Sequence, residues 1–210
     1  MTEPRHLTPF VNWPHDLVLV LASRSPRRAE LLTIAGIPHE IVPPGPVEEE
    51  LAASLTHLHH DPAAYAVDLA VAKARDVARS LPGRLVLGSD TVVVLDGDVL
   101  EKPADHREAV HLVSRLAGRK HVVISAVALV GGPAGEGPVV AHEETEVEFL
   151  SLAPEAIERY VATGEPMDKA GAYGIQGYGA MMVRGVRGCY FNVMGLPLAR
   201  LGELLNGVLA

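Results

Sequence analysis

An unbroken apolar run at residues 17–22 is followed at once by a polar turn and a helical pattern, and this succession most constrains the fold. A run of this length without polar residues is typical of a strand buried on both faces. Within the turn at 23–28, Ser25 suits a helix N-cap and Pro26 the first helical position. The helical pattern stops at Gly36. The sequence therefore predicts a strand, a tight polar turn and a helix in direct succession.

The same alternation continues along the chain. Further helices are expected at 62–81, 105–116, 154–162 and 198–205, and further strands at 85–95, 121–130 and 144–149. Residues 181–183 and 190–193 are expected to form a last hairpin. Because helices and strands interleave, the predicted fold class is α/β or mixed α+β. The length of 210 residues fits one domain, or two tightly coupled lobes.

The charge balance narrows the choice of partners. The chain has 18 Lys and Arg against 26 Asp and Glu, a net charge of −8, which argues against a nucleic-acid polymer or an anionic membrane. The longest apolar runs are too short to cross a bilayer, and the N-terminus lacks a secretory pattern, so we expect a cytoplasmic protein. The single cysteine, Cys189, excludes an internal disulfide and is expected to serve packing. A small basic site could still bind a phosphorylated substrate.

The turn at 23–28 is the first candidate for such a site. A helix N-terminus offers unpaired N–H groups, to which Ser23 adds a hydroxyl and Arg27 and Arg28 add planar cationic groups that match phosphate oxygens. The alternative is an ordinary helix start with solvated arginines. The turn has the glycine pattern of neither a P-loop nor a Rossmann fold.

Three further charged residues are candidates for the site. Asp90 lies in the middle of an apolar strand, so its carboxylate must be paired, metal-bound or directed into a cleft. It is a candidate metal ligand or general base; the alternative is a cap of the next turn. Lys73 lies on the apolar side of its helix and Lys102 precedes Pro103. Either could bind a phosphate, although a lysine such as Lys73 can also reach the surface along its stem.

Two further segments carry polar groups. The acids at 48–50 could supply a second carboxylate for a divalent cation, or form a solvated loop, and the histidines at 57, 59 and 60 are expected to be solvated. Residues 165–179 are glycine-rich, which permits close approach to a ligand. Lys169 and Gln176 are among the polar groups of this segment, and the Gln176 amide can both donate and accept toward a base edge. The alternative is a purely structural turn.

Seven segments occur together in a fixed order: LASRSPRRAELL (21–32), KA (73–74), SDTVV (89–93), LEKP (100–103), LAGRKHVV (116–123), EPMDKAGAYGIQGYGAMMV (165–183) and GCYFNVMGLPL (188–198). With these segments the chain resembles the Maf family of nucleoside triphosphate pyrophosphatases. The resemblance implies cleavage of a nucleoside triphosphate between its α and β phosphates with a divalent cation, Mg²⁺, Mn²⁺ or Co²⁺. It also implies an elongated, twisted central sheet like that of inosine triphosphatases, and subunits that pair as homodimers. Residues 17–210 would form one catalytic domain of two lobes around a substrate cleft, preceded by an extension at 1–16.

The resemblance also assigns residues to roles. In the dTTP/UTP type of the family, selectivity for pyrimidines is tied to three positions that here are Arg27, Thr91 and Gln176. That type implies dTTP and UTP as substrates, with CTP and modified pyrimidine nucleotides as further candidates. The alternatives are a 7-methyl-GTP pyrophosphatase of the same family and a regulatory binding protein that arrests septum formation.

The remaining roles concern catalysis, metal and phosphates. The resemblance implies that Asp90 is catalytic and holds the cation together with one acid. The usual Asp-Glu pair of the family stands here at 47–49, so that acid is Glu48 or Glu49, with Glu49 preferred. The residues expected to bind phosphates are Ser23, Arg28, Lys73, Lys102 and Lys169.

Overall fold

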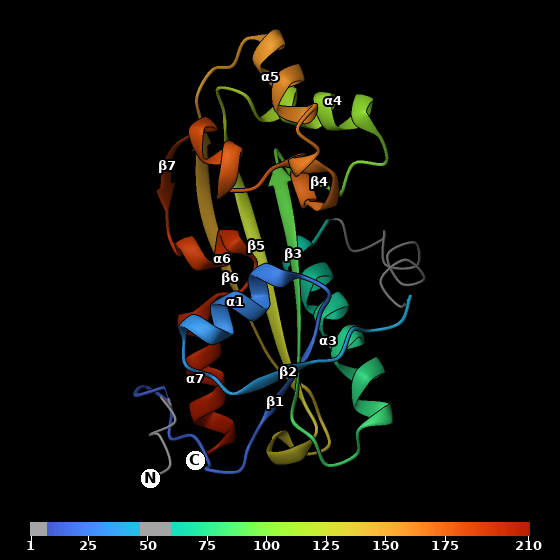
Figure 1. Cartoon of the computed structure of the whole chain (residues 1–210), viewed down its shortest axis with the longest axis vertical. Coiled ribbons are helices and arrows are strands. Elements are labelled where there is room, and N and C mark those ends of the chain that lie inside the picture. Colours follow the sequence, from blue (N-terminus) through green and yellow to red (C-terminus); the bar gives the residue numbers. More distant parts are fainter. Residues whose placement is uncertain (1–7, 47–59) are drawn as a thin grey trace.

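A mixed seven-stranded sheet runs along the length of the molecule in the computed structural model, which describes residues 8–46 and 60–210 (Figure 1). Its order is β2-β1-β3-β5-β6-β7, with β4 also paired to β3. The β1 strand is parallel to β2 and β3, and the other pairs are antiparallel. The strands are β1 (Leu19–Ala22), β2 (His39–Ile41), β3 (Val86–Leu95), β4 (Asp98–Leu100), β5 (Lys120–Val130), β6 (Val139–Phe149) and β7 (Val183–Arg187).

Helices cover both faces of this sheet, which confirms the predicted mixed α/β class. The α-helices are α1 (Pro26–Ile34), α3 (Pro62–Ser80), α4 (His106–Leu116), α5 (Pro154–Val161), α6 (Tyr190–Met194) and α7 (Leu198–Val208). Short 3₁₀ turns are η2 (Gly132–Ala134), η3 (Glu165–Asp168), η4 (Ala170–Ala172) and η5 (Gly177–Met182). Figure 1 shows α3 and α7 on opposite sides of the long strands, with α4 and α5 at one end.

The β1 strand explains why its sequence is apolar without interruption. Leu19 and Leu21 belong to the core that includes residues of α1 and α7, whereas Val20 and Ala22 belong to the core beneath α3. All four side chains are fully buried. Since successive side chains of a strand point to opposite faces, burial on both faces demands a continuous apolar run, as predicted.

The β3 strand has an interrupted edge. Along one edge it pairs with β5 from Val86 to Val94. Along the other, β1 ends opposite Gly88 and β4 begins opposite Val93, so residues 89–92 face no strand of the described chain on that side. This gap opens the middle of the sheet from the side, and side chains from both faces of β3 can reach it.

The α3 helix crosses β3 at Gly88, directly beside this gap. A β-carbon added at Gly88 would lie 2.1 Å from the carbonyl oxygen of Ala70 and 2.9 Å from the amide nitrogen of Ala74. Only a glycine therefore permits this approach. The contact also holds Lys73 of α3 close to β3.

One predicted element is wrong. The expected last hairpin is absent from the described chain: β7 pairs with β6 instead, and residues 190–194 form the helix α6. The aromatic and β-branched residues there suggested a strand. The helix is instead held by its tertiary contacts, because the Asn192 side chain is fully buried and hydrogen-bonds to β5 and β6. The other predicted helices and strands are confirmed with small shifts of their ends, and β6 begins earlier, at Val139.

The segment 8–16 packs against the core that includes residues of α1 and α7. Val11 and Trp13 are each 7% exposed, and the Trp13 indole donates a hydrogen bond to the Leu17 carbonyl (2.8 Å). The Asn206 amide donates to the Phe10 carbonyl (3.0 Å). Within residues 8–46 and 60–210, no helix is long and apolar enough to cross a membrane.

Replacement of Gly88 by alanine tests the contact between α3 and β3. The new methyl group would overlap a backbone oxygen, so α3 must move, and we expect a loss of at least about 2 kcal/mol in the free energy of unfolding. Urea denaturation measures this loss. Gly137→Ala is the matched control, because a β-carbon there meets open space, and it should change stability by less than about 0.5 kcal/mol. Equal effects of the two substitutions would contradict the proposed close packing.

A buried histidine predicts how stability depends on pH. His121 is 3% exposed, stacks edge-on against Phe149 and Tyr173, and its Nε2 lies 2.8 Å from the Tyr173 hydroxyl. Desolvation lowers the pKa of His121 from its usual 6.5 to about 4. Below pH 6.5 the unfolded chain therefore gains a proton that the folded chain does not, and stability falls with pH until the folded histidine titrates.

Between pH 7 and pH 5 this histidine should lower the free energy of unfolding by about 2 kcal/mol. Urea denaturation at both pH values checks this, and His121→Gln should remove that part of the pH dependence. His111→Gln, at an exposed histidine, is the control for the loss of one imidazole. An unaltered slope in His121→Gln would show that other groups cause it.

Candidate active site

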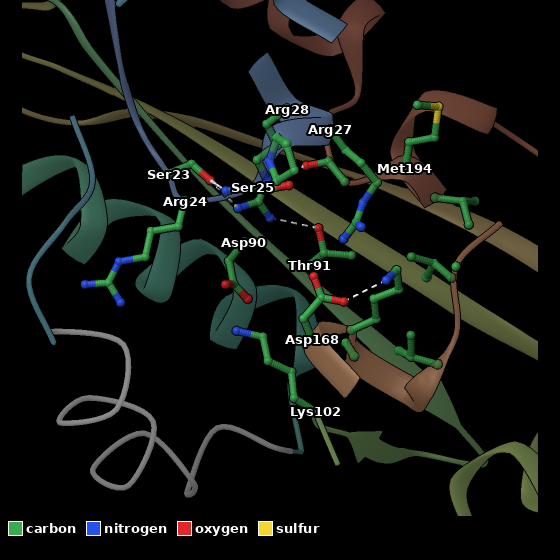
Figure 2. A pocket seen from close by; sticks show the side chains of 18 of the residues that line it. Ser23, Arg24, Ser25, Arg27, Arg28, Asp90, Thr91, Lys102, Asp168 and Met194 are labelled. Carbon is green, nitrogen blue, oxygen red and sulfur yellow. Dashed lines mark hydrogen bonds and ion pairs between the residues drawn. The ribbon is translucent and has the colours of Figure 1, made fainter. Parts of the chain in front are cut away.

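A cavity of about 710 Å³ lies at the gap in the edge of β3. This volume is in the range of ligand-binding sites. The cavity gathers side chains from the first turn, α3, β3, the β4–α4 connection and the glycine-rich segment, several of which are labelled in Figure 2. Nine residues selected from the sequence line it together: Ser23, Arg27, Arg28, Lys73, Asp90, Thr91, Lys102, Lys169 and Gln176. The remaining two, Glu48 and Glu49, lie outside the described residues, as do the histidines at 57 and 59.

The first turn presents its helix start to this cavity. Ser25 is the N-cap of α1 and Pro26 occupies the first helical position, as predicted. The Ser25 side chain makes no capping hydrogen bond within the described chain. The Ser23 hydroxyl is oriented inward, since its oxygen accepts from the Ser25 amide (3.1 Å) and from Arg28 Nη1 (3.1 Å). The N-terminus of α1 thus lies beside a serine and an arginine, a combination suited to anions.

Hydrogen bonds to three residues of the described chain fix the Arg28 guanidinium. Besides Ser23, it donates through Nε to the Gly195 carbonyl (2.9 Å) and through Nη2 to the Thr91 hydroxyl (3.2 Å) (Figure 2). Ser23 belongs to the same turn, whereas Thr91 and Gly195 are distant in sequence. The planar guanidinium is therefore held in one orientation before any ligand arrives.

The Thr91 hydroxyl belongs to a chain of hydrogen bonds whose direction can be assigned. The Ser125 hydroxyl donates to the Asn192 carbonyl (2.8 Å), so toward Thr91 it accepts, across 2.8 Å. Thr91 in turn accepts from Arg28. The single hydroxyl proton of Thr91 is directed to Ser125. Thr91 can therefore only accept a hydrogen bond from a ligand, or contact it through its methyl group.

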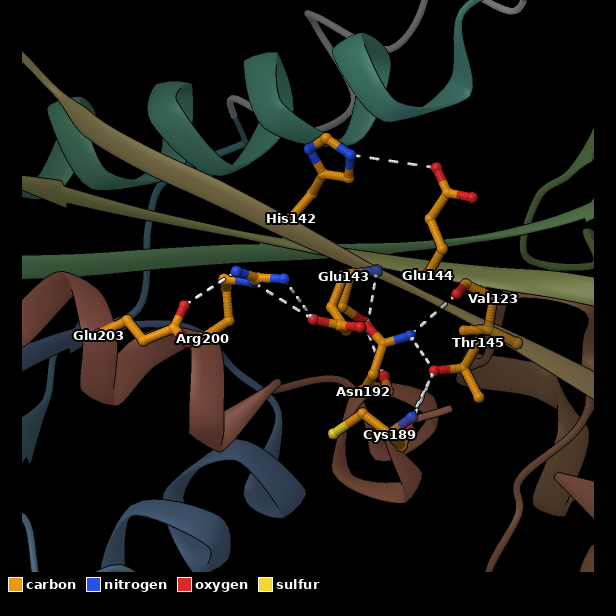
Figure 3. A network of polar contacts seen from close by, with 10 residues as sticks. Val123, His142, Glu143, Glu144, Thr145, Cys189, Asn192, Arg200 and Glu203 are labelled. Carbon is orange, nitrogen blue, oxygen red and sulfur yellow. Dashed lines mark hydrogen bonds and ion pairs between the residues drawn. The ribbon is translucent and has the colours of Figure 1, made fainter. Parts of the chain in front are cut away.

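Asn192 anchors the far end of this chain (Figure 3). Its Oδ1 accepts from the Ser125 amide (3.0 Å), and its Nδ2 donates to the Val123 carbonyl (2.9 Å) and the Thr145 hydroxyl (3.0 Å). The residue is fully buried with these bonds satisfied. A buried and satisfied network of this kind gives the β5–β6 side of the site a single rigid arrangement.

On the opposite face of β3, Asp90 and Lys73 form a buried ion pair. Lys73 Nζ lies 2.6 Å from Asp90 Oδ1, and the two residues are 4% and 6% exposed. Within the described chain, no hydrogen bond to Asp90 Oδ2 is found. Asp90 and Thr91 point to opposite faces, yet both line the cavity because the strand edge between them is uncovered.

The glycine-rich segment at 165–179 also lines the cavity. Lys169 donates to the Asp168 carboxylate (2.6 Å) and to the Glu165 carbonyl. Desolvation alone would raise the pKa of Asp168, but the hydrogen bond and charge of Lys169 and the charge of Arg27 lower it below its usual 3.8. Arg27, Asp168 and Lys169 are therefore electrostatically linked across the cavity.

The lining is richer in cations than the chain as a whole. Six basic side chains and four carboxylates of the described residues line the cavity, although the protein carries a net charge of −8. The basic side chains are Arg24, Arg27, Arg28, Lys73, Lys102 and Lys169; the carboxylates are Asp90, Glu101, Glu165 and Asp168. A concave site with this excess attracts an anion locally on an acidic protein.

Sequence reasoning did not single out several residues of the site. Glu101 lines the cavity and its Oε1 accepts from the Tyr65 hydroxyl (2.9 Å); it directly precedes Lys102, and that position was its only signal. Ser125 and Asn192 act behind the cavity wall. Their importance follows from contacts between strands and a helix far apart in sequence, which no local pattern encodes.

The donors of the site fit a hard divalent cation bound partly by its substrate. The described residues contain no group of three His, Cys, Asp or Glu side chains that could hold a metal ion alone. Asp90 nevertheless offers a carboxylate oxygen at the cavity. Mg²⁺ is commonly bound by one or two carboxylates together with substrate phosphates. The fit therefore requires a phosphate ligand in the same cavity.

The chain is similar to proteins of one family over nearly its whole length. The sequence profile described as Maf-like protein matches residues 18–208. A dTTP/UTP pyrophosphatase of Symbiobacterium thermophilum is 50% identical over 188 residues, covering 90% of this chain and 92% of that protein. One of Moorella thermoacetica is 52% identical, covering 89% and 93%. Among solved structures, a HAM1 protein from Coxiella burnetii has 19% identity and a TM-score of 0.46 over 80% of each chain.

Proposed function

Because this chain belongs to the Maf-like protein family, we propose that it hydrolyses dTTP and UTP between the α and β phosphates, releasing the monophosphate and pyrophosphate. The observation that carries the proposal is the convergence of nine sequence-selected residues on one cavity. Relatives named dTTP/UTP pyrophosphatase over nine-tenths of the chain favour these two nucleotides. CTP and modified pyrimidine nucleotides are further candidates.

The triphosphate would bind along the basic side of the cavity. Arg28 is already oriented by hydrogen bonds to Gly195, Ser23 and Thr91, and the start of α1 lies beside it. Lys102 and Lys169 would contact the outer phosphates, and Lys73 would add charge beside Asp90. A preoriented set of donors stabilises the charge that develops on the phosphates without reorganisation.

Asp90 would act on the attacking water. The water oxygen bonds to the α-phosphorus while the bond from this phosphorus to the bridging oxygen breaks, and pyrophosphate leaves. The carboxylate of Asp90 accepts the proton of the water. Lys73, whose Nζ donates to Asp90 Oδ1 across 2.6 Å, holds this carboxylate in place.

Asp90 and one of Glu48 and Glu49, with Glu49 preferred, would hold the cation, for which Mg²⁺, Mn²⁺ and Co²⁺ are candidates. When bound, such a cation neutralises phosphate charge and polarises phosphate oxygens. The support from this chain is the carboxylate oxygen that Asp90 offers at the cavity.

Selectivity for the base would come from Arg27, Thr91 and Gln176. An amide presents a donor and an acceptor side by side, which complements the N3–H and O4 edge of uracil and thymine. Gln176 is therefore the residue that reads the base edge. The hydroxyl proton of Thr91 is directed to Ser125. Thr91 contributes by orienting Arg28 and by offering its methyl group as a contact surface.

Further proposals concern the setting of the enzyme. We propose a homodimer in the cytoplasm, where nucleoside triphosphates are found, and a single catalytic unit of two lobes around the cavity. Pairing of subunits is supported by the family resemblance and by exposed apolar side chains on η5, β7 and α6. They are Tyr178, Met181, Val186, Tyr190 and Phe191.

Pyrophosphate release from dTTP, UTP, CTP and 7-methyl-GTP tests the activity. We expect release from dTTP and UTP that requires Mg²⁺, Mn²⁺ or Co²⁺ and stops with a chelator. Asp90→Asn should lower kcat by about 10²–10⁴-fold, because the neutral amide cannot accept the proton. Asp98→Asn, at an exposed carboxylate that pairs with Arg115, is the control and should retain the full rate.

Asp90→Asn also leaves Lys73 buried beside a neutral group, so its folding is checked by circular dichroism at the assay temperature. A folded Asp90→Asn variant with the wild-type rate would contradict the catalytic role. Release from 7-methyl-GTP alone would identify the other type of the family, and release from none of the nucleotides would favour a binding protein.

Replacement of Gln176 by alanine tests base reading. The selectivity ratio is defined as kcat/KM for the preferred pyrimidine nucleotide divided by that for the least preferred nucleotide of the panel. Loss of the amide should lower this ratio by at least about tenfold while kcat for the preferred nucleotide changes less. An equal loss for all four nucleotides would contradict a base-reading role.

A further inference from the structure

The backbone on both sides of Gln176 is tied to two side chains, Tyr160 and Glu165. Before Gln176, the amide of Gly174 donates to the Tyr160 hydroxyl (3.2 Å). After it, the amides of Tyr178 and Gly179 donate to the Glu165 carboxylate, at 2.9 and 3.0 Å. The Tyr160 hydroxyl also donates to Glu165 Oε1 (3.1 Å). We call this pair of side chains the clamp.

The clamp supplies the cap that the local sequence does not provide. The turn η5 (Gly177–Met182) begins directly after Gln176, whose own side chain makes no capping bond within the described chain. The Glu165 carboxylate instead receives two of the first N–H groups of this turn. Both of its oxygens are engaged, and a carboxylate at the start of a helical turn is electrostatically favourable.

Two glycines make room for this carboxylate. A β-carbon at Gly177 would lie 2.4 Å from Glu165 Oε2, and Gly177 also has φ +67°. A β-carbon at Gly179 would lie 3.2 Å from Glu165 Oε1, 3.0 Å from the Tyr160 hydroxyl and 2.1 Å from the Gly174 carbonyl oxygen. The glycine-rich composition of this segment therefore matches the space that the clamp needs.

Glu165 is a carboxylate in a cavity whose charged side chains are mostly basic. Glu165 lines the same cavity as the basic residues, where a carboxylate would repel a polyphosphate. Its charge is met by three donors from the protein: the two amides and the Tyr160 hydroxyl. This use of both oxygens favours a role in ordering the backbone over a role as a cation ligand.

We propose that Tyr160 and Glu165 are positioning residues that fix Gln176 for base recognition. An amide that can rotate offers its donor and acceptor to a base edge in either order, so it discriminates between bases only when it is held. The clamp holds the backbone two residues before Gln176 and two and three residues after it. This inference rests on the base-reading role proposed for Gln176.

Two substitutions remove the clamp while keeping side-chain size. In Glu165→Gln one oxygen can still accept, but the new NH₂ group faces a backbone N–H. Tyr160→Phe removes the hydroxyl and leaves the ring in its buried place. Glu155→Gln, on the exposed surface of α5 and outside the cavity lining, is the matched control.

The first measurement is the selectivity ratio defined above. Each clamp variant should lower it about tenfold, through KM for the preferred nucleotide, with less than about threefold change in kcat. In a Gln176→Ala background the same substitutions should lower the ratio no further, because the group they position is gone. A full further loss in that background would overturn the proposal and leave a general structural role.

The second measurement does not depend on turnover. Hydrogen exchange should become at least about tenfold faster at the amides of Tyr178 and Gly179 in Glu165→Gln, and at Gly174 in Tyr160→Phe, while amides of β3 and β5 keep their rates. Unchanged exchange at these amides would overturn the clamp even in an active enzyme. Faster exchange without any effect of Gln176→Ala on selectivity would instead locate the failure in the base-reading role.

Discussion

The interrupted pairing of β3 is the constraint on which the site depends. One edge of this strand is paired with β5 along nearly its whole length, whereas the other edge meets β1 and β4 only at its two ends. The uncovered stretch at 89–92 lets side chains from both faces of the sheet reach one cavity. Asp90 contributes from the α3 face and Thr91 from the opposite face. A fully paired strand would have separated these two residues by a layer of backbone.

Each side of the gap is made rigid by a different interaction. On the α3 face, the close approach at Gly88 keeps Lys73 beside Asp90, and each charge lowers the cost of burying the other. On the other face, hydrogen bonds run from Arg28 through Thr91 and Ser125 to Asn192. The site is thus ordered before substrate binds, which suits a reaction in which catalysis consists mainly of positioning and charge neutralisation.

The distribution of charge reconciles an acidic protein with a polyanionic substrate. Acids on β6 pair with basic side chains at the surface, as Glu146 does with Lys120 and Glu143 with Arg200. In the cavity the basic side chains outnumber the carboxylates, and Glu165 is occupied by backbone amides. Overall charge therefore disfavours long polyanions, while a triphosphate meets a local excess of positive charge.

The sequence by itself determined the order and kind of most elements and nine of the residues that line the cavity. Apolar runs, N-caps and glycines act through neighbouring residues, and motif residues keep their spacing, so both can be identified locally. It did not identify α6, because the aromatic and β-branched residues at 190–193 suggest a strand until Asn192 is seen anchored to β5 and β6. Only the tertiary structure decided that Asp90 pairs with Lys73, that Thr91 directs its proton to Ser125, and that Glu165 caps the turn after Gln176. Each depends on contacts between segments far apart in the chain, which packing of the whole sheet and its helices brings together.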